Sequence, residues 1–182
     1  MGLEYLFFKT GPLTMPPSQL GAFAKSDPNR LSANMEWHVQ PLSLDKFGDP
    51  LHKFNAITPS VCNLRPTSRG QVRIKSPDPH DYPSIELNYL STVEDREVAL
   101  AGIRFTRRIM EAPPLKPFNP SEWKPGTSVS SDEELLNAAG DLATTIFHPV
   151  GSCKMGHDPT SVVDDRLAVR GIQRLRVIDA SV

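Results

Sequence analysis

The sequence predicts an α+β fold, with an antiparallel sheet and helices packed on one of its faces. Short segments that alternate apolar and polar residues occur without helices between them, and two segments with helical periodicity follow later. Proline accounts for 18 of the 182 residues, about twice the usual share of ~5%. So much proline favours short elements joined by extended loops. Strands followed by helices are typical of the α+β class.

Four short segments are predicted to be strands: residues 36–40, 57–64, 71–75 and 85–88. Trp37 and Val39 should point the same way from the first strand, and Val72 and Ile74 should point inward from the third. Pro59 favours an edge or a bulge for the second strand. Residues 9–34 are rich in Pro, Gly, Ser and Asn, and they are predicted to be loop.

Two helices are predicted from their capping residues. In the first, Ser91 precedes Glu94 by three residues, as in a capping box, and the helix should end before Pro113. Its apolar face has helical spacing and comprises Val98, Ala101, Phe105 and Ile109. In the second, Ser131 and Glu134 form the capping box. Gly140 is the expected end of that helix.

Composition argues against several classes of protein. The formal net charge is −1, so nucleic-acid binding is not expected. Cys62 and Cys153 are too few for a disulfide framework. The apolar start of the chain lacks a basic n-region, and no stretch is long enough for a membrane span, so we expect a cytoplasmic protein. A local basic cluster is interpreted as a solvated or ion-paired surface, although a nearby anionic cofactor also fits: Arg166, Arg170, Arg174 and Arg176.

The densest group of chemically active residues lies around His148. Pro149 and Gly151 follow it and predict a constrained loop, the kind of segment that often carries catalysis. Spacing alone leaves three hypotheses open. His148 is a packed interior histidine, or it acts as a general acid or base, a role that suits imidazole. Alternatively, His148, Cys153 and His157 ligate zinc, although their spacing matches no structural zinc pattern.

The chain resembles the C-terminal portion of the glucose-methanol-choline oxidoreductases, in particular the choline-dehydrogenase-like branch. The matching motifs occur in the family's order over nearly the whole chain: residues 10–13 (TGPL), 62–70 (CNLRPTSRG), 88–90 (NYL) with the helix opened by Asp95, 148–155 (HPVGSCKM) and 175–182 (LRVIDASV). The resemblance implies a flavoenzyme that oxidises an alcohol CH–OH group by hydride transfer to FAD. It implies that His148 is the catalytic acid or base, and that Asp179 and Ala180 contact the cofactor.

The resemblance also implies that parts of the family's active site lie outside this chain. No two glycines are separated by a single residue, so the GxGxxG turn that seats the FAD pyrophosphate is absent. The family's second catalytic His or Asn follows the Asp-Ala-Ser segment, and the sequence stops at Val182. We therefore expect a fragment that is inactive alone and needs an FAD domain, in cis or in trans, to act on a small alcohol. A non-catalytic remnant or binding module is the alternative.

We divide the chain into three parts on this basis. Residues 1–55 would be a loop-rich N-terminal segment of the substrate domain, and residues 56–174 would be the family's C-terminal domain. Residues 175–182 (LRVIDASV) are apolar and are predicted to begin a strand that returns to the FAD domain. Arg65, Ser68, Arg69 and Gly70 are expected to form a structural turn, with the arginines bound to carbonyl or carboxylate groups.

Overall fold

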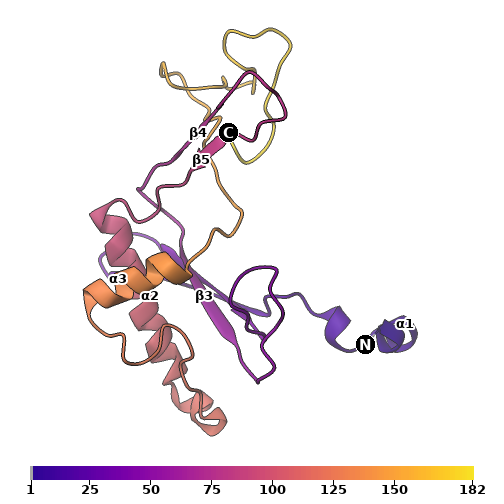
Figure 1. The fold of residues 1–182 in the computed structure, drawn as a ribbon, viewed down its shortest axis with the longest axis vertical. Coiled ribbons are helices and arrows are strands. Elements are labelled where there is room, and N and C mark those ends of the chain that lie inside the picture. Colours follow the sequence, from indigo (N-terminus) through magenta and orange to yellow (C-terminus); the bar gives the residue numbers. More distant parts are fainter. Residues whose placement is uncertain (1) are drawn as a thin grey trace. The chain divides into compact units, whose positions relative to one another are not determined.

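The computed structural model describes residues 2–182, which form two compact units (Figure 1). The first unit contains the chain up to Ser68 together with Leu90–Asp141. The second contains Arg69–Tyr89 and Leu142–Val182. Helices accompany antiparallel strands in the described chain, and the predicted α+β class is confirmed.

The first unit is built on a three-stranded antiparallel sheet in the order β1-β2-β3. The strands are β1 (Leu20–Ala24), β2 (Met35–Gln40) and β3 (Thr58–Asn63). Pro59 lies in β3, which pairs only with β2 in this sheet, so the predicted edge position is confirmed. The expectation of loop throughout residues 9–34 is wrong, because β1 and the 3₁₀ helix η1 (Pro12–Thr14) lie there. β1 forms by pairing with β2, a long-range interaction that its composition does not indicate.

Helix α2 (Val93–Met110) covers one face of this sheet and forms the main core with it. Met35, Trp37 and Val98 are almost fully buried there. The Trp37 ring packs 5.1 Å from the Phe105 ring. The Trp37 indole N–H also donates a 2.7 Å hydrogen bond to the Thr106 hydroxyl, which satisfies its one polar group. The predicted apolar face of this helix is therefore confirmed in its contacts.

Gly102 allows α2 to approach the sheet closely. A Cβ atom at Gly102 would lie 3.2 Å from both Val61 methyl groups. We expect Gly102→Leu to destabilise the chain by about 1–3 kcal/mol through overpacking. Gly140→Ala in the third helix is the matched control, because a Cβ there meets nothing within 4 Å. It should stabilise by about 0.5–1 kcal/mol through helix propensity. Urea denaturation would measure both, and equal effects would contradict the close approach.

The two long helices begin close to their predicted starts. Thr92 caps α2 in place of the predicted Ser91, because its hydroxyl accepts the Asp95 N–H. Glu94, the predicted partner of Ser91 in the capping box, forms an ion pair with Arg30 at 2.9 Å. The second capping box is confirmed in α3 (Asp132–Leu142), where Ser131 and Glu134 exchange backbone-to-side-chain hydrogen bonds of 3.1 and 3.3 Å.

The end of α3 and two shorter helical segments complete the helices of the described chain. α3 runs two residues beyond the expected stop at Gly140. A short helix α1 (Gly2–Phe8) opens the chain, and the 3₁₀ helix η2 (Pro113–Phe118) follows α2. Arg107 of α2 holds the segment after η2 through a bidentate pair with Glu122 and bonds to two backbone carbonyls.

The second unit contains little regular structure. Strands β4 (Gln71–Arg73) and β5 (Ser84–Glu86) form a two-stranded antiparallel ribbon. The prediction that Val72 and Ile74 point inward is wrong, since they are 56% and 89% exposed. A two-stranded ribbon has no second layer of its own within this unit to cover them. Across residues 2–182, no helix combines the length and apolar character that crossing a bilayer requires.

Candidate functional site

His148 lies in an irregular segment that follows α3. No regular helix or strand is present between Leu142 and Lys154, all within the described chain. Phe147 and Gly151 both have positive φ, 63° and 79°, so the backbone turns sharply on either side of the His148-Pro149 pair. The His148 side chain is exposed in this chain, which does not support the hypothesis of a packed interior histidine. The expectation of a constrained loop agrees with these dihedral angles.

The loop that carries His148 is joined to the last turn of the chain. The Cys153 N–H donates a 2.7 Å hydrogen bond to the Ser181 carbonyl oxygen. In that turn, the backbone N–H and the hydroxyl of Ser181 both donate to Asp179 Oδ1. These bonds hold the pKa of the Asp179 carboxyl below its usual range, the Ser181 hydroxyl having the largest effect. Two of the three site residues expected from the sequence, Asp179 and Ala180, thus belong to a turn bonded to the His148 loop.

Residues 175–182 were predicted to begin a strand that returns to the FAD domain, and within this chain alone they form no regular strand. Arg176 forms only an isolated bridge with Ala168, and Asp179–Ser181 is a turn. The Asp179 carboxylate accepts the backbone N–H of Ser181, a local bond that holds this turn. Of the basic cluster, Arg170 and Arg176 donate to the backbone carbonyls of Gly156 and Arg166.

Asp158 stabilises the chain between the loop and the turn. Its carboxylate accepts from the Lys154 ammonium, from Thr160 through both backbone and hydroxyl, and from the Ser161 hydroxyl. The hydroxyl of Ser161 has the largest effect, and together these donors hold the pKa of Asp158 well below its usual range. Val163 is fully buried behind this segment. The loop after His148 therefore rests on a fixed scaffold within its own unit.

The zinc hypothesis of His148, Cys153 and His157 finds no support in the geometry. Within residues 2–182, a single group of three His, Cys or carboxylate side chains brings its ligand atoms within 4.8 Å of one another, and it is a different one. It consists of Glu36, His38 and Cys62 in the first unit. Neither Cys62 nor Cys153 forms a disulfide.

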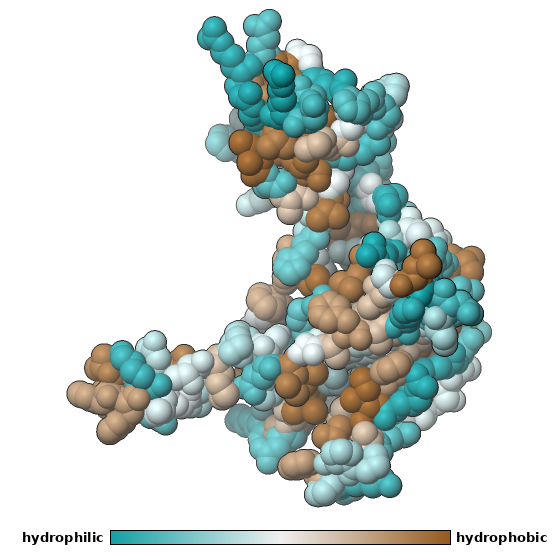
Figure 2. All heavy atoms as spheres, turned by 180° about the vertical axis from the view of Figure 1, so that it is seen from behind, coloured by the Kyte–Doolittle hydropathy of each residue, from teal (hydrophilic) through white to brown (hydrophobic). Residues whose placement is uncertain are grey.

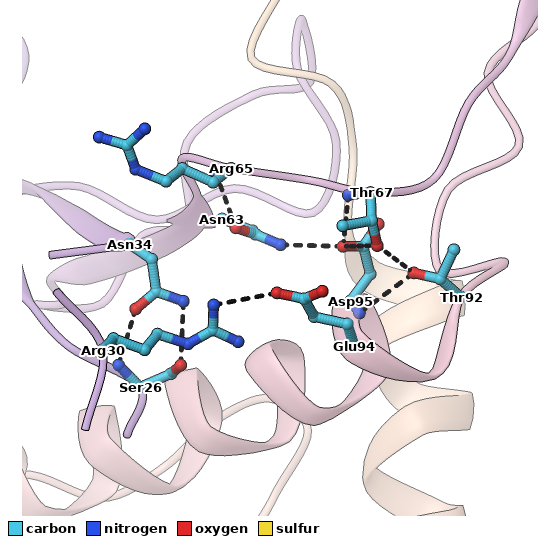
Figure 3. A network of polar contacts seen from close by, with 9 residues as sticks. All are labelled: Ser26, Arg30, Asn34, Asn63, Arg65, Thr67, Thr92, Glu94 and Asp95. Atoms are coloured by element: carbon cyan, nitrogen blue, oxygen red, sulfur yellow. Dashed lines mark hydrogen bonds and ion pairs between the residues drawn. The ribbon is translucent and has the colours of Figure 1, made fainter. Parts of the chain in front are cut away.

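Asp95 organises the Cys62–Gly70 motif, and sequence reasoning missed this role (Figure 3). It is 4% exposed, and its carboxylate accepts the backbone N–H groups of Thr67 and Ser68 at 2.9 and 2.8 Å. The Thr67 hydroxyl and the Asn63 amide donate to it as well. Burial alone would raise the pKa of Asp95, but the hydrogen bonds from Ser68 and Thr67 outweigh it and lower the pKa. An acidic residue in a first helical turn is normally solvated, so spacing could not reveal this contact.

The expected turn at Gly70 involves a close contact between backbones. A Cβ atom at Gly70 would lie 2.1 Å from the Glu86 carbonyl oxygen, a distance no side chain tolerates. The Asn88 amide donates a 2.9 Å bond to the Arg69 carbonyl and closes the turn on the other side. The structural role proposed for Gly70 is in agreement with this geometry.

Comparisons with known proteins define first a class and then a family. The class is an α+β portion of an oxidoreductase, and residues 66–182 match the family model described as GMC oxidoreductase. The chain belongs to the GMC oxidoreductase family. The family predicted from the sequence is thereby confirmed.

Individual relatives agree with the family. The chain is 42% identical to an alcohol dehydrogenase [acceptor] of Pseudomonas putida over 98% of its length, and 40% identical to an oxygen-dependent choline dehydrogenase of Proteus mirabilis over its full length. These matches cover 32% and 33% of the relatives, so the chain spans about a third of their length. A formate oxidase of Aspergillus oryzae RIB40, studied for FAD modification, matches with a TM-score of 0.85 and 26% identity. This match covers the whole of the present chain and 36% of the oxidase chain.

Proposed function

We propose that this chain forms part of a longer flavoenzyme that oxidises an alcohol CH–OH group, with His148 as the catalytic acid or base. The observation that carries the proposal is the hydrogen bond from Cys153 to Ser181. It joins the segment that follows the exposed His148 to the Asp179-Ala180 turn within the second unit. Both segments match motifs of the family that the sequence resembles, and the bond supports the idea that two motifs about 30 residues apart in sequence serve one site.

The residues of these segments fit FAD as one wall of its site. The bonds from Ser181 engage Oδ1 of Asp179, which leaves Oδ2 as an acceptor for a donor group of the cofactor. Ala180 has a small side chain, so a planar group can approach the backbone of the turn closely. The chain has no GxG sequence, and the pyrophosphate must therefore be held by another part of the enzyme. We assign Asp179 and Ala180 to cofactor contacts and place most of the FAD site outside this chain.

The proposed mechanism assigns His148 to a proton and leaves the redox chemistry to the cofactor. FAD, when bound, supplies the acceptor for the hydride. His148 takes the hydroxyl proton of the alcohol, and the developing alkoxide then releases the carbon-bound hydrogen far more readily than a neutral alcohol would. Backbone turns at Phe147 and Gly151 flank His148 and support a fixed position for its imidazole. The alcohol dehydrogenase and choline dehydrogenase relatives support a small alcohol as substrate.

Exposed apolar surface supports the need for a further domain. Both units expose many large apolar side chains, seen as brown areas in Figure 2. They include Leu20, Phe23, Leu31 and Phe47 in the first unit, and Ile74, Val150 and Ile178 in the second. Single exposed apolar residues are ordinary, but this many in one chain indicates a surface that a partner covers. The partner we propose is the FAD domain of the same enzyme, in cis or in trans. A free binding module would instead expose this apolar surface to solvent.

The proposal predicts a difference between this chain and the longer enzyme. The purified chain, mixed with FAD and passed through gel filtration, should elute colourless and should not oxidise alcohol. The longer enzyme should retain flavin, and anaerobic addition of a primary alcohol should bleach its visible absorption. Flavin retained by the chain alone would show that the cofactor site is mainly here. Flavin in the longer enzyme that no alcohol bleaches would contradict the proposed reaction.

A further inference from the structure

A second group of reactive side chains lies on the sheet of the first unit. β2 alternates, so Met35 and Trp37 face the core while Glu36 and His38 lie on the opposite face. Cys62 of β3 pairs directly with Glu36 across the antiparallel ladder and so shares its face. All three side chains are half-buried. The sheet itself therefore fixes two positions on one strand and a third on its neighbour.

The distances within this group are close to those of a metal site. The candidate ligand atoms of Glu36, His38 and Cys62 all lie within 4.8 Å of one another, and His38 Nε2 lies 3.4 Å from Glu36 Oε1. Zinc bonds of ~2.0–2.3 Å in tetrahedral geometry separate ligand atoms by roughly 3.3–3.8 Å. The nitrogen and the carboxylate oxygen are already at that spacing, and a small rotation about the Cys62 side chain would bring in the sulfur.

The ligand types select zinc. Imidazole, carboxylate and thiolate together suit zinc, whereas magnesium and calcium prefer oxygen ligands alone. The burial of Cys62, and then the charge of Glu36, raise the pKa at which the thiol releases its proton. A divalent ion would replace that proton, which passes to solvent, and its two positive charges would balance the thiolate and the carboxylate.

Space for the ion and for an exchangeable ligand is available beside the group. The β1 residue opposite His38 is Gly21, which has no side chain to cover that side. A Cβ atom at Gly21 would meet only the Trp37 carbonyl, at 3.7 Å. We propose that Glu36, His38 and Cys62 form a three-ligand zinc site with one open coordination position, the arrangement that zinc sites use when they bind water or another small ligand.

Cobalt(II) tests this proposal through its bond to sulfur. Added to the purified full chain, Co²⁺ should give a near-ultraviolet thiolate-to-cobalt absorption band at one equivalent, and Zn²⁺ should abolish it. Cys62→Ser should lose the band. Cys153→Ser is the matched control, because it removes the other half-buried free cysteine and should keep the band. Circular dichroism checks that each variant folds, and Cys62→Ala provides a second replacement if the serine variant does not.

The nitrogen and oxygen ligands are tested by affinity. His38→Gln and Glu36→Gln should each weaken Zn²⁺ binding by about 100-fold or more, because losing even an outer-shell partner costs ~10–100-fold. Competition with a chromophoric chelator measures this. The absence of any band in the folded chain, a band that survives in Cys62→Ser, or unchanged affinity in both glutamine variants would each overturn the proposal. A band lost in Cys153→Ser would overturn it in favour of the His148 segment.

Discussion

Flavin reduction by alcohol in the longer enzyme should slow by about 10²–10⁴-fold when His148 is replaced by alanine, the usual contribution of a positioned acid or base. Bound flavin should remain, because the proposed cofactor contacts of this chain lie at Asp179 and Ala180. The His148 side chain is exposed and carries none of the core, so the variant should fold normally. Anaerobic stopped-flow measurement of the flavin absorption gives the rate of hydride transfer directly.

His157→Ala is the matched control for this experiment. His157 is also an exposed histidine of the same unit, nine residues further along the chain, and it has no role in the proposed reaction. Its replacement should leave the reduction rate within about twofold of the native enzyme, since surface substitutions are usually mild. A native rate in His148→Ala would remove His148 from the chemistry. Loss of flavin in that variant would assign it to cofactor binding instead.

The parts of the fold that the sequence predicts are those determined by local pattern. The alternation around Trp37 predicted β2, and Ser131 with Glu134 predicted the start of α3, because side chains within a few residues fix both features. β1 was missed because Leu20–Ala24 becomes a strand only by pairing with β2. Ile74 was wrongly placed inside because alternation shows two faces of a strand without showing whether anything covers either of them.

The candidate sites show the same limit. The family motifs located His148 and Asp179, but the bond between Cys153 and Ser181 that joins their segments depends on the path of the chain between them. Glu36 and His38 are two apart in the sequence and visibly share a face, yet their pairing with Cys62 depends on the register of β3. Contacts between strands join residues that are far apart in the sequence, so the local pattern of a single sequence does not predict them.

Replacing Asp95 with alanine should destabilise the chain by roughly 2–4 kcal/mol. The variant would leave the backbone N–H groups of Thr67 and Ser68 without their acceptor, and each unsatisfied buried group costs about 1–3 kcal/mol. Asp132→Ala is the matched control, since Asp132 also lies in the first turn of a helix and its side chain is 63% exposed. Its pair with Arg104 is a surface contact worth about 0–1 kcal/mol. Urea denaturation measures both, and equal losses would contradict a special role for Asp95.

The contribution of Asp95 should also depend on pH, with a defined sign. Its pKa is lowered in the folded chain, because the hydrogen bonds from Ser68 and Thr67 outweigh the burial that would raise it. A lowered folded pKa contributes stability that is fully present above the unfolded value of about 3.9 and is lost as the pH falls through the folded pKa. Asp95→Asn removes the titration of Asp95 alone. Other carboxyls with a lowered pKa, such as Asp158, titrate in the native chain and in the variant alike, so the difference between the two curves of unfolding free energy against pH isolates Asp95. The free energy of unfolding should therefore fall less steeply below pH ~4 in the variant. Parallel curves would mean that Asp95 accepts these bonds equally well when protonated, and that its role is geometric rather than electrostatic.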